Sequence, residues 1–463
     1  MAIIKKKTAK KKTAKKKTIK NRNLKSAQAK NITEISIVKL FGYSSYTIPL
    51  NLKNGNLSIV YGDNGAGKTT ILTLLFRLLS PVSGRGDKTF VAQTPFEQFT
   101  VKFDNGISVR AYRKSSLVGS FTVEITKDGK KIFSLPITAS EDNTILPENV
   151  PKIPELEDQL REIGIELYFL PDDRRVRTTF PNSLDPSASN ERYSSARERY
   201  DHIKKQSREK YSQDEKTHHL NIRPVLDQVN NWIRTKAITA SHSGEQNTNS
   251  VYLSVLNSLV IQNNIHSESS SDSVSKFEIK LKHIAERSEQ FSIYDFATIF
   301  PAKKYISLLR AAQPEIQSTI MTVLDARVDG IIARLDALEK TMEVVSTFIN
   351  SINQFFHQKT ITFNLRHGLC ILDREGFMLE PNNLSSGEKQ LLLLLSNTIL
   401  ARDTATVFII DEPELSLNIK WQRLLVEALI KCSEGSDIQY IMASHSIQLF
   451  SEQRDSVCRL IET

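Results

Sequence analysis

Cysteines and long apolar segments are scarce in this sequence. It has three cysteines in 463 residues, Cys370, Cys432 and Cys458, and no CxxC pair, which argues against both a disulfide framework and a zinc site. No run of 18 or more apolar residues occurs, so no transmembrane helix is predicted. The positive start of the chain lacks the apolar stretch of a secretory signal. Together these absences predict a cytoplasmic protein with no membrane association.

Positive charge is concentrated at one end of the chain. The net charge is +10, yet residues 1–25 contain eleven lysines, Arg22 and no acidic residue, which leaves 50 basic and 52 acidic residues elsewhere. The lysines follow a five-residue repeat over residues 5–19. Such a block repels itself and buries no core, so residues 1–31 are predicted to form a disordered tail. Either the tail attracts DNA or another acidic partner, or it is a solvated extension or a start codon chosen too far upstream.

The first folded segment is predicted over residues 32–185. Strands are expected at residues 35–40, 57–61, 99–103, 107–113, 120–126, 131–135 and 163–170, with a helix at residues 68–79. Turn sequences at residues 104–106 and 127–129 separate the later strands as hairpins. The segment therefore combines a strand–turn–helix unit with an antiparallel β subdomain.

Residues 186–357 differ in character, because strand signals vanish and charged, helix-favouring sequence takes over. Near the end of this helical insertion, apolar residues alternate spacings of four and three, which places them on one stripe of a long helix. They are Ile331, Leu335, Leu338, Met342, Val345, Ile349 and Ile352. The stripe either packs within its own domain or joins a hairpin or intermolecular coiled coil. No catalytic constellation is found here, and His218 and His219 lie in a polar stretch typical of exposed residues.

Strand signals return in residues 358–463. Strands at residues 360–365 and 370–373 are predicted as a hairpin with Gly368 or Gly376 in its turns, followed by a helix from about Ser386. Apolar residues 406–410 and 439–443 predict buried parallel strands on either side of a helix at residues 417–432. The expected fold is α/β, with one domain formed by both end segments and interrupted by the helical insertion.

Residues 62–69 match the pattern GxxxxGK[ST] between a predicted strand and a predicted helix, where a phosphate-binding loop must lie. Glycines let consecutive backbone N–H groups turn toward an anion, and the helix N-terminus adds its positive end. Lys68 is expected to reach the β- and γ-phosphates of ATP, and the Thr69 hydroxyl to bind Mg²⁺. The predicted nucleotide-binding residues of this loop are Gly62, Asn64, Gly65, Gly67, Lys68, Thr69 and Thr70.

Two acidic residues, Asp411 and Glu412, follow the apolar strand predicted at residues 406–410. A carboxylate at the tip of a buried strand beside a phosphate loop can hold the water shell of Mg²⁺, and Asp411 is assigned that role. Glu412 follows directly and can polarise the attacking water as the general base.

A serine- and glycine-containing segment, Leu-Ser-Ser-Gly-Glu-Lys-Gln, occupies residues 384–390. Ser385 and the backbone N–H groups that follow can cap a helix or bind phosphate there. The segment precedes Asp411 in the chain, and His445 comes after Asp411, just beyond a predicted strand. In this order the segments resemble the Walker A, signature, Walker B and switch-histidine motifs of ABC-type ATPases, with the signature in the version of OLD-like and SMC-like members.

The resemblance covers residues 32–185 and 358–463 and implies an ABC ATPase nucleotide-binding domain, which is a P-loop NTPase with an antiparallel β subdomain, here interrupted by a helical insertion. It implies ATP hydrolysis with Mg²⁺. The implied catalytic residues are Lys68, Glu412 and His445, and the implied signature contacts to nucleotide are Ser385, Ser386, Gly387 and Glu388. Ser386 stands where the family has glycine and Glu388 where it has glutamine, and both changes are common in SMC-like members.

Two further family positions can be placed. Gln93 is implied as the Q-loop ligand of the metal, with Gln98 as a competing assignment, and residues 416–418 fall at the D-loop. In this family the signature of one subunit closes over the ATP of another, so the resemblance implies a homo-oligomer, at least an ATP-sandwiched dimer.

The sequence after Asp411 resembles the DEPExxLH…WQ pattern of OLD-like ATPases, many of which act in anti-phage defence. Some carry a C-terminal Toprim nuclease, for which the short segment after His445 leaves no room. The resemblance therefore implies the ATPase of a two-gene system, first of the PARIS kind with its Toprim nuclease, next of the Septu kind with its HNH nuclease. The expected role is a sensor and scaffold that holds a separate nuclease effector and releases it on a phage trigger, such as an acidic DNA mimic.

A different class of function stays open. An SMC-like DNA-repair or DNA-clamping ATPase predicts hydrolysis stimulated by duplex DNA and binding that is lost at high salt. A transporter ATPase subunit fits less well, because the sequence after Asp411 and the long insertion differ from that family's pattern.

Overall fold

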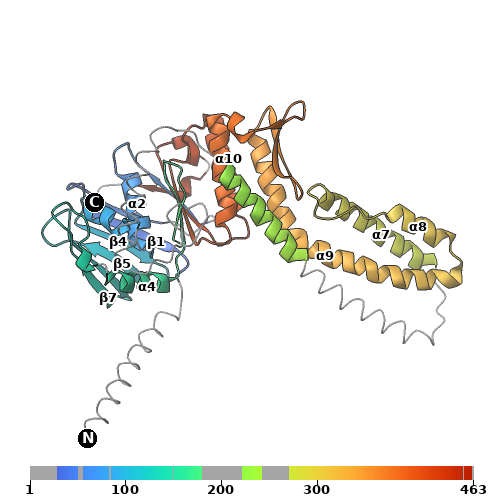
Figure 1. The fold of residues 1–463 in the computed structure, drawn as a ribbon, viewed down its shortest axis with the longest axis horizontal. Helices are drawn as coiled ribbons and strands as arrows, with labels where there is room; N and C mark the ends of the chain where they lie inside the picture. The colour runs from blue at the N-terminus through green and yellow to red at the C-terminus, as the bar shows by residue number, and fades with distance from the viewer. Residues whose placement is uncertain are drawn as a thin grey trace, which may run out of the picture. The chain divides into compact units, whose positions relative to one another are not determined.

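The computed structural model describes residues 29–50, 56–82, 85–149, 151–179, 222–241, 271–451 and 453–460. The chain divides into two compact units: the P-loop unit, Met1–Leu220 with Ala401–Thr463, and the helical unit, Asn221–Leu400 (Figure 1). By this division residues 358–400, which the sequence assigns to the ATPase domain, lie in the helical unit. Residues 1–28 of the predicted tail, and most of residues 186–270, lie outside the described residues.

The P-loop unit is built on a six-stranded sheet in the order β15-β3-β14-β13-β8-β9. Five strands are parallel, and β9 runs antiparallel to β8. Their bounds are β3 (Leu57–Tyr61), β8 (Leu167–Leu170), β9 (Arg177–Thr178), β13 (Val407–Asp411), β14 (Gln439–Ser444) and β15 (Val457–Arg459). The central strands β13 and β14 are buried at every residue, as their apolar runs predict. Because parallel strands share one carboxyl edge, the loops after β3, β8, β13 and β14 converge there.

A second six-stranded sheet, in the order β2-β1-β4-β5-β6-β7, is antiparallel throughout. Its strands are β1 (Ile32–Leu40), β2 (Ser44–Pro49), β4 (Gln98–Phe103), β5 (Ile107–Tyr112), β6 (Phe121–Lys127) and β7 (Lys130–Ile137). Gly106 and Gly129, with φ of 77° and 75°, lie in the predicted hairpin turns. The mixed α/β fold with an antiparallel β subdomain is confirmed.

The helices of this unit are α2 (Lys68–Leu79), α3 (Asp87–Gln93), α4 (Ile153–Ile163) and α11 (Ile419–Cys432). Helix α2 is apolar on nearly every side, with Ile71, Leu72, Leu74 and Leu75 fully buried. These residues belong to one core cluster with the inward faces of the antiparallel sheet, α4 and the central parallel strands. The helix behind the phosphate loop is therefore anchored on several sides by burial of apolar surface.

The helical unit begins with a helix at residues 223–241. It continues with α7 (Ser271–Ser292), α8 (Ala302–Ala311), α9 (Pro314–Phe355), the strands β10 (Lys359–Asn364), β11 (Gly368–Asp373) and β12 (Met378–Leu379), and α10 (Ser386–Ala401). One apolar cluster comes mainly from α7, α8 and α9 and includes Leu281, Leu309 and Val328, and further apolar residues are buried along α9 and α10. Most of the predicted stripe on α9 is buried, from Leu335 to Ile352. Among the described residues, no helix has the length and apolar character that crossing a bilayer requires.

One predicted strand, over residues 163–170, is partly wrong. Helix α4 continues to Ile163 and ends where Gly164 adopts φ 85°, so only Leu167–Leu170 forms β8. A glycine in the left-handed region commonly ends a helix, and the apolar residues on both sides of Gly164 resemble one continuous strand in the sequence.

Candidate active site

The phosphate loop joins β3 to α2, and its glycines are required by geometry. Gly65 and Gly67 have φ of 84° and 85°, where a side chain would be strained. A Cβ on Gly67 would lie 2.5 Å from Cδ2 of Leu40, and a Cβ on Gly62 would lie 3.2 Å from Cδ1 of Leu460. Neighbouring side chains therefore leave no room for a Cβ at Gly67 and little room for one at Gly62.

Lys68 is 6% exposed, although it is the first residue of α2 and carries a charge. Its Nζ donates hydrogen bonds to the carbonyl oxygens of Gly62 at 2.8 Å and Asp63 at 3.0 Å. The ammonium group is thereby folded back over the loop, at the place where bound phosphate would lie. Asn64 and Thr69 of the same loop and helix start are exposed, and Thr70 is half-buried.

Asp411 ends β13 and is completely buried. Neither of its carboxylate oxygens has a well-formed hydrogen bond within the described chain. Burial raises the pKa of Asp411 to about 6, and only the nearby Thr69 hydroxyl and the Arg174 charge act against it. Buried carboxylate oxygens without donors, close to an alcohol oxygen, are what a hard cation needs. Thr69 and Asp411 therefore fit Mg²⁺, which would neutralise the carboxylate and the phosphate charges.

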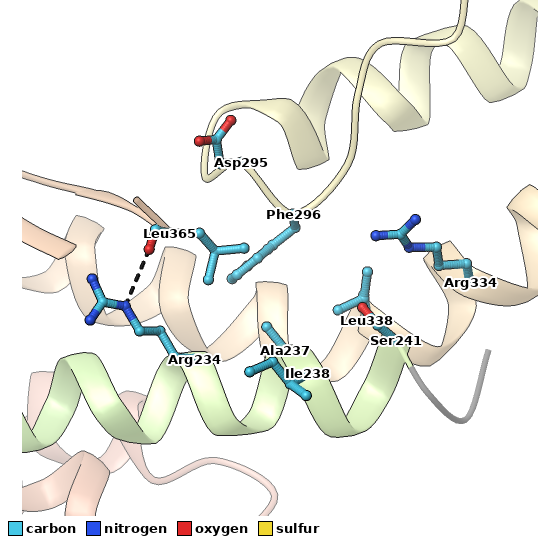
Figure 2. Close-up of a pocket in the computed structure, with 9 residues that line it drawn as sticks. All are labelled: Arg234, Ala237, Ile238, Ser241, Asp295, Phe296, Arg334, Leu338 and Leu365. Carbon is cyan, nitrogen blue, oxygen red and sulfur yellow. Dashed lines mark hydrogen bonds between the residues drawn. The ribbon is translucent and has the colours of Figure 1, made fainter. Parts of the chain in front are cut away.

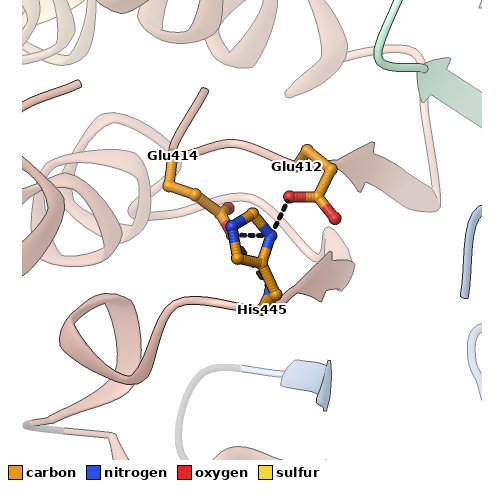
Figure 3. A group of neighbouring side chains, drawn as sticks. All are labelled: Glu412, Glu414 and His445. Carbon is orange, nitrogen blue, oxygen red and sulfur yellow. Dashed lines mark hydrogen bonds and ion pairs between the residues drawn. The ribbon is translucent and has the colours of Figure 1, made fainter. Parts of the chain in front are cut away.

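Glu412 and His445 form a direct pair. The imidazole Nδ1 lies 2.5 Å from Oε2 of Glu412 (Figure 3). Burial and the Glu414 carboxylate raise the pKa of Glu412, while His445 and Lys68 act in the opposite direction. A glutamate with a raised pKa, whose side chain is 20% exposed, is suited to accept a proton from water. His445 follows β14, so both groups reach this point from neighbouring strand ends.

Glu414 was not singled out from the sequence, yet it holds the loop that carries His445. Its side chain is 4% exposed. Oε1 accepts hydrogen bonds from Oγ of Ser444 at 2.6 Å and from the N–H groups of His445 at 3.0 Å and Ser446 at 3.3 Å. Its signals in the sequence are its place shortly after Glu412 and its match to the second glutamate of the DEPExxLH pattern. With Glu412 and His445 it forms a group whose ligand atoms lie within 4.8 Å, part of the same site.

The signature segment begins α10 with a reciprocal pair of hydrogen bonds. The N–H of Ser385 donates to Oε2 of Glu388 at 2.7 Å, and the N–H of Glu388 donates to Oγ of Ser385 at 3.3 Å. This is a capping box. Lys359 adds an ion pair to Glu388 at 2.8 Å, and although burial raises the pKa of Glu388, these partners lower it overall. Ser385 and Ser386 are exposed, and Gly387 is buried.

Gln93, the implied metal ligand, is the last residue of α3 and its side chain is exposed. Within the described part of the chain no hydrogen bond joins it to Thr69 or Asp411. The competing Gln98 lies on β4, where its side chain donates to Oγ1 of Thr100 at 3.2 Å. The Q-loop assignment stays a prediction.

The helical unit has a pocket of about 460 Å³ that contains none of the predicted site residues. Arg234 and Arg334 lie at opposite ends of a group of apolar side chains that includes Phe296 and Leu338 (Figure 2). The Arg234 guanidinium is already engaged, because its Nε donates to the carbonyl oxygen of Leu365 at 3.2 Å. The reactive groups converge at the carboxyl edge of the parallel sheet instead.

That edge brings together three features. The ammonium group of Lys68 lies over the phosphate loop, the Asp411 carboxylate lies near the Thr69 hydroxyl, and Glu412 pairs with the His445 imidazole. Of the residues predicted from sequence, Lys68, Thr69, Asp411, Glu412 and His445 lie at this edge in the P-loop unit, and Ser385–Glu388 lie in the helical unit. The arrangement is suited to binding a nucleoside triphosphate and activating water against its terminal phosphate.

Comparisons with known protein families indicate the family to which this chain belongs. A family profile described as an AAA domain matches residues 34–361, which is more than half of the chain. Another, described as "AAA domain, putative AbiEii toxin, Type IV TA system", matches residues 318–451. No curated protein matches.

The solved structures similar to this chain include two Smc heads. One is an Smc head domain with an extended coiled coil, bound to the C-terminal domain of ScpA, from Pyrococcus furiosus, with 12% identity over 93% of this chain and 96% of that one and a TM-score of 0.39. The other is an Smc head bound to the C-winged helix domain of ScpA, with 11% identity over 93% and 97% and a TM-score of 0.36.

The parallel sheet with a phosphate loop after β3, and the profile match across most of its length, identify the family of this chain. It has the fold of a P-loop NTPase. The chain belongs to the AAA-domain family of ATPases.

Proposed function

We propose that the chain hydrolyses ATP with Mg²⁺ in a site completed by a second copy of itself. The observation that carries the proposal is the pairing of Glu412 with His445 at the same sheet edge as Lys68 and Asp411. Glu412 is the general base, His445 holds it and contacts the γ-phosphate, and Thr69 and Asp411 hold the metal. Ser385, exposed at the start of α10, supplies the contact to the nucleotide of the partner copy.

The biological role we propose is an ATP-driven sensor and scaffold in bacterial anti-phage defence. The chain would hold a separate Toprim-type nuclease and release it when a phage protein, such as an acidic DNA mimic, is sensed. Support comes from the OLD-like sequence after Asp411 and from the profile over residues 318–451, whose description names a putative AbiEii toxin of a type IV toxin–antitoxin system. ATP between two copies would set the assembly state, and hydrolysis would loosen it.

Glu412→Gln tests the site. The amide keeps the size of the side chain but cannot accept the proton, so hydrolysis should fall about 1,000-fold while ATP stays bound. Size-exclusion chromatography with ATP and Mg²⁺ should then show a stable dimer or larger oligomer that the wild type forms only transiently. Glu427→Gln, on the outer face of α11, is the control and should behave as wild type. Normal turnover by Glu412→Gln would refute the assignment of the base.

Co-expression tests the role. The chain and a nuclease encoded beside it should copurify with ATP, and a purified trigger protein should separate them and start DNA cleavage. A gene with no nuclease neighbour would contradict the scaffold role, although not ATP hydrolysis.

The alternative function is an SMC-like ATPase that clamps DNA, favoured by the lysine repeat over residues 5–19. Duplex DNA should then stimulate hydrolysis, and a chain lacking residues 1–25 should lose that stimulation and most of the salt dependence of DNA binding. Equal hydrolysis with and without DNA would remove this alternative.

A further inference from the structure

Arg174 lies in the loop after β8, at the carboxyl edge of the parallel sheet. Its side chain is 8% exposed. Strand β8 pairs in parallel with β13, with Leu170 opposite Ile410. The loops after these two strands are therefore neighbours, which brings Arg174 to Asp411 and Glu412 although they are far apart in the sequence.

The guanidinium group of Arg174 holds the backbone on both sides of the Glu412 Cα atom. Nη1 donates to the carbonyl oxygen of Asp411 at 2.9 Å, and Nη2 donates to the carbonyl oxygen of Glu412 at 2.6 Å. The N–H of Glu412 in turn donates to the carbonyl oxygen of Ala443 at 2.9 Å. These three bonds fix the peptide groups before and after Glu412, and with them its φ and ψ.

Glu412 needs such restraint because its backbone is strained. Its φ is 47°, in the left-handed region that residues with a Cβ rarely adopt. Arg174 has φ 61° and is strained in the same way. Without the bonds from Arg174, the backbone of Glu412 would relax to a negative φ, and its carboxylate would turn away from His445.

The chemistry of arginine suits this task. Its planar group presents two parallel donors, which match two carbonyl oxygens on one stretch of backbone. Within the described chain, all of its hydrogen bonds go to backbone carbonyl oxygens, the third being a long contact of 3.5 Å to Pro171. Carboxylates of Asp411, Asp172, Glu414 and Glu412 surround the charge, which offsets part of the cost of burying it.

We propose that Arg174 is a positioning residue for ATP hydrolysis, which aims the Glu412 carboxylate by clamping the two peptide groups that flank it. It acts through Glu412 and not on the nucleotide, so its role rests on the proposed function of Glu412 as the base. Losing the clamp should slow the chemical step and leave the binding of ATP in place.

The test compares Arg174→Ala and Arg174→Lys with Arg175→Ala, whose side chain is exposed on the neighbouring residue. For Arg174→Ala we expect kcat to fall about 10- to 100-fold, because a small misplacement of a catalytic group has effects of that size. The affinity for a fluorescent ATP analogue should change less than about threefold. Arg174→Lys should not restore the rate, since one ammonium cannot bond both carbonyls in that geometry. Arg175→Ala should match wild type.

Two measurements separate positioning from a structural role. Millimolar guanidinium chloride should restore part of kcat to Arg174→Ala by filling the cavity left by the side chain. The double variant Arg174→Ala/Glu412→Gln should be no slower than Glu412→Gln alone, because Arg174 acts through that residue.

Three results would overturn the role of Arg174. The first is a kcat for Arg174→Ala equal to that of Arg175→Ala. The second is a double variant that hydrolyses ATP more slowly than Glu412→Gln. The third is an Arg174→Ala variant that loses ATP affinity, Tm and kcat together and regains none of its kcat with guanidinium. Full hydrolysis by Glu412→Gln would refute the proposed function itself, and with it the basis for the clamp. An inactive Glu412→Gln beside a fully active Arg174→Ala would refute the clamp alone.

Discussion

The carboxyl edge of the parallel sheet and the α7–α9 face of the helical unit both gather charged side chains, but in different surroundings. At the sheet edge Asp411 is fully buried, and Lys68, Glu414 and Arg174 are only 6%, 4% and 8% exposed. On the helical face Lys280 joins Asp325 and Asp329, and Arg287 joins Asp336 and Glu339, with the acidic side chains 43% to 59% exposed. Burying charged side chains at the sheet edge costs free energy, whereas the same residue types on the α7–α9 face stay partly solvated at little cost.

The apolar clusters behind these two charged regions differ in the same sense. The P-loop unit has a large cluster that runs through both of its sheets, α2 and α4, whereas the cluster between α7, α8 and α9 is small. A large core can offset the strain and buried charge that a catalytic site requires. The small α7–α9 cluster instead lies beside partly solvated ion pairs. The comparison predicts that charge changes at the sheet edge alter function strongly, and that charge changes on the α7–α9 face alter stability alone, and only weakly.

The largest effect is expected from Lys68→Ala. It removes the cation that lies over the phosphate loop, so ATP affinity should fall about 100-fold or more, as expected for a lost charge-assisted bond to phosphate. Isothermal titration calorimetry with ATP and Mg²⁺ measures it. The Tm without nucleotide should stay close to that of wild type. Lys130→Ala, on the exposed β6–β7 hairpin, is the control. Unchanged affinity would contradict the role of the loop.

The next largest effect is expected from Asp411→Asn. This change should weaken the binding of ATP with Mg²⁺ but raise the stability of the fold. Because burial raises the pKa of Asp411 from 3.8 to about 6, the folded protein binds a proton between these values that the unfolded chain has released. The stability of wild type therefore falls as the pH rises from about 3.8 to about 6, and the full penalty is present above pH 6. Asparagine resembles the protonated form. It should raise the free energy of unfolding above pH 7 by about 1–3 kcal/mol.

Urea unfolding in EDTA at several values between pH 4.5 and 8 measures this difference, which should shrink as the pH falls toward 4.5. Mg²⁺ with ATP should stabilise wild type and not Asp411→Asn, since the carboxylate that holds the metal is gone. Asp437→Asn, whose side chain is 95% exposed, serves as the control and should show neither change. A stability difference that is the same at every pH would contradict the buried-carboxylate explanation.

Sequence patterns predicted those parts of the candidate site that lie within one local segment. The phosphate loop and β13 carry spacing and burial signals of their own, and they occur where the sequence predicts them, as does the start of α10 in the helical unit. Arg174 lacks such a signal, and the match of Glu414 to the DEPExxLH pattern does not show what it contacts. Arg174 reaches Glu412 only because β8 pairs with β13, and Glu414 matters only because β14 places Ser444 and His445 over it. Strand pairing between segments on opposite sides of a long insertion could not be derived from one sequence.

The elements that were missed have different causes. Helix α3 has only seven residues, too few to show a period. Helix α4 does carry a helical signal, because Ile153, Leu156, Leu160 and Ile163 recur at spacings of three and four, and that signal could have predicted it. The ion pair between Lys359 and Glu388 could not be predicted for another reason. A charged residue at the start of a strand is most often solvated, so its sequence position does not indicate a partner.

The smallest effect is expected from Arg287→Met in the helical unit. Its guanidinium contacts Asp336 at 2.8 Å and Glu339 at 2.6 Å, both on α9. Since these pairs are partly solvated, their loss should lower the local stability of α7 and α9 by only about 0.5–1 kcal/mol. Hydrogen exchange of the amides in these helices measures that change, which should be smaller at 0.5 M salt than at 0.05 M because ions screen the pairs. Arg334→Met is the matched control, because Arg334 makes no ion pair among the described residues of this unit. A cost of about 3 kcal/mol, typical of a broken buried pair, would erase the distinction between the two regions.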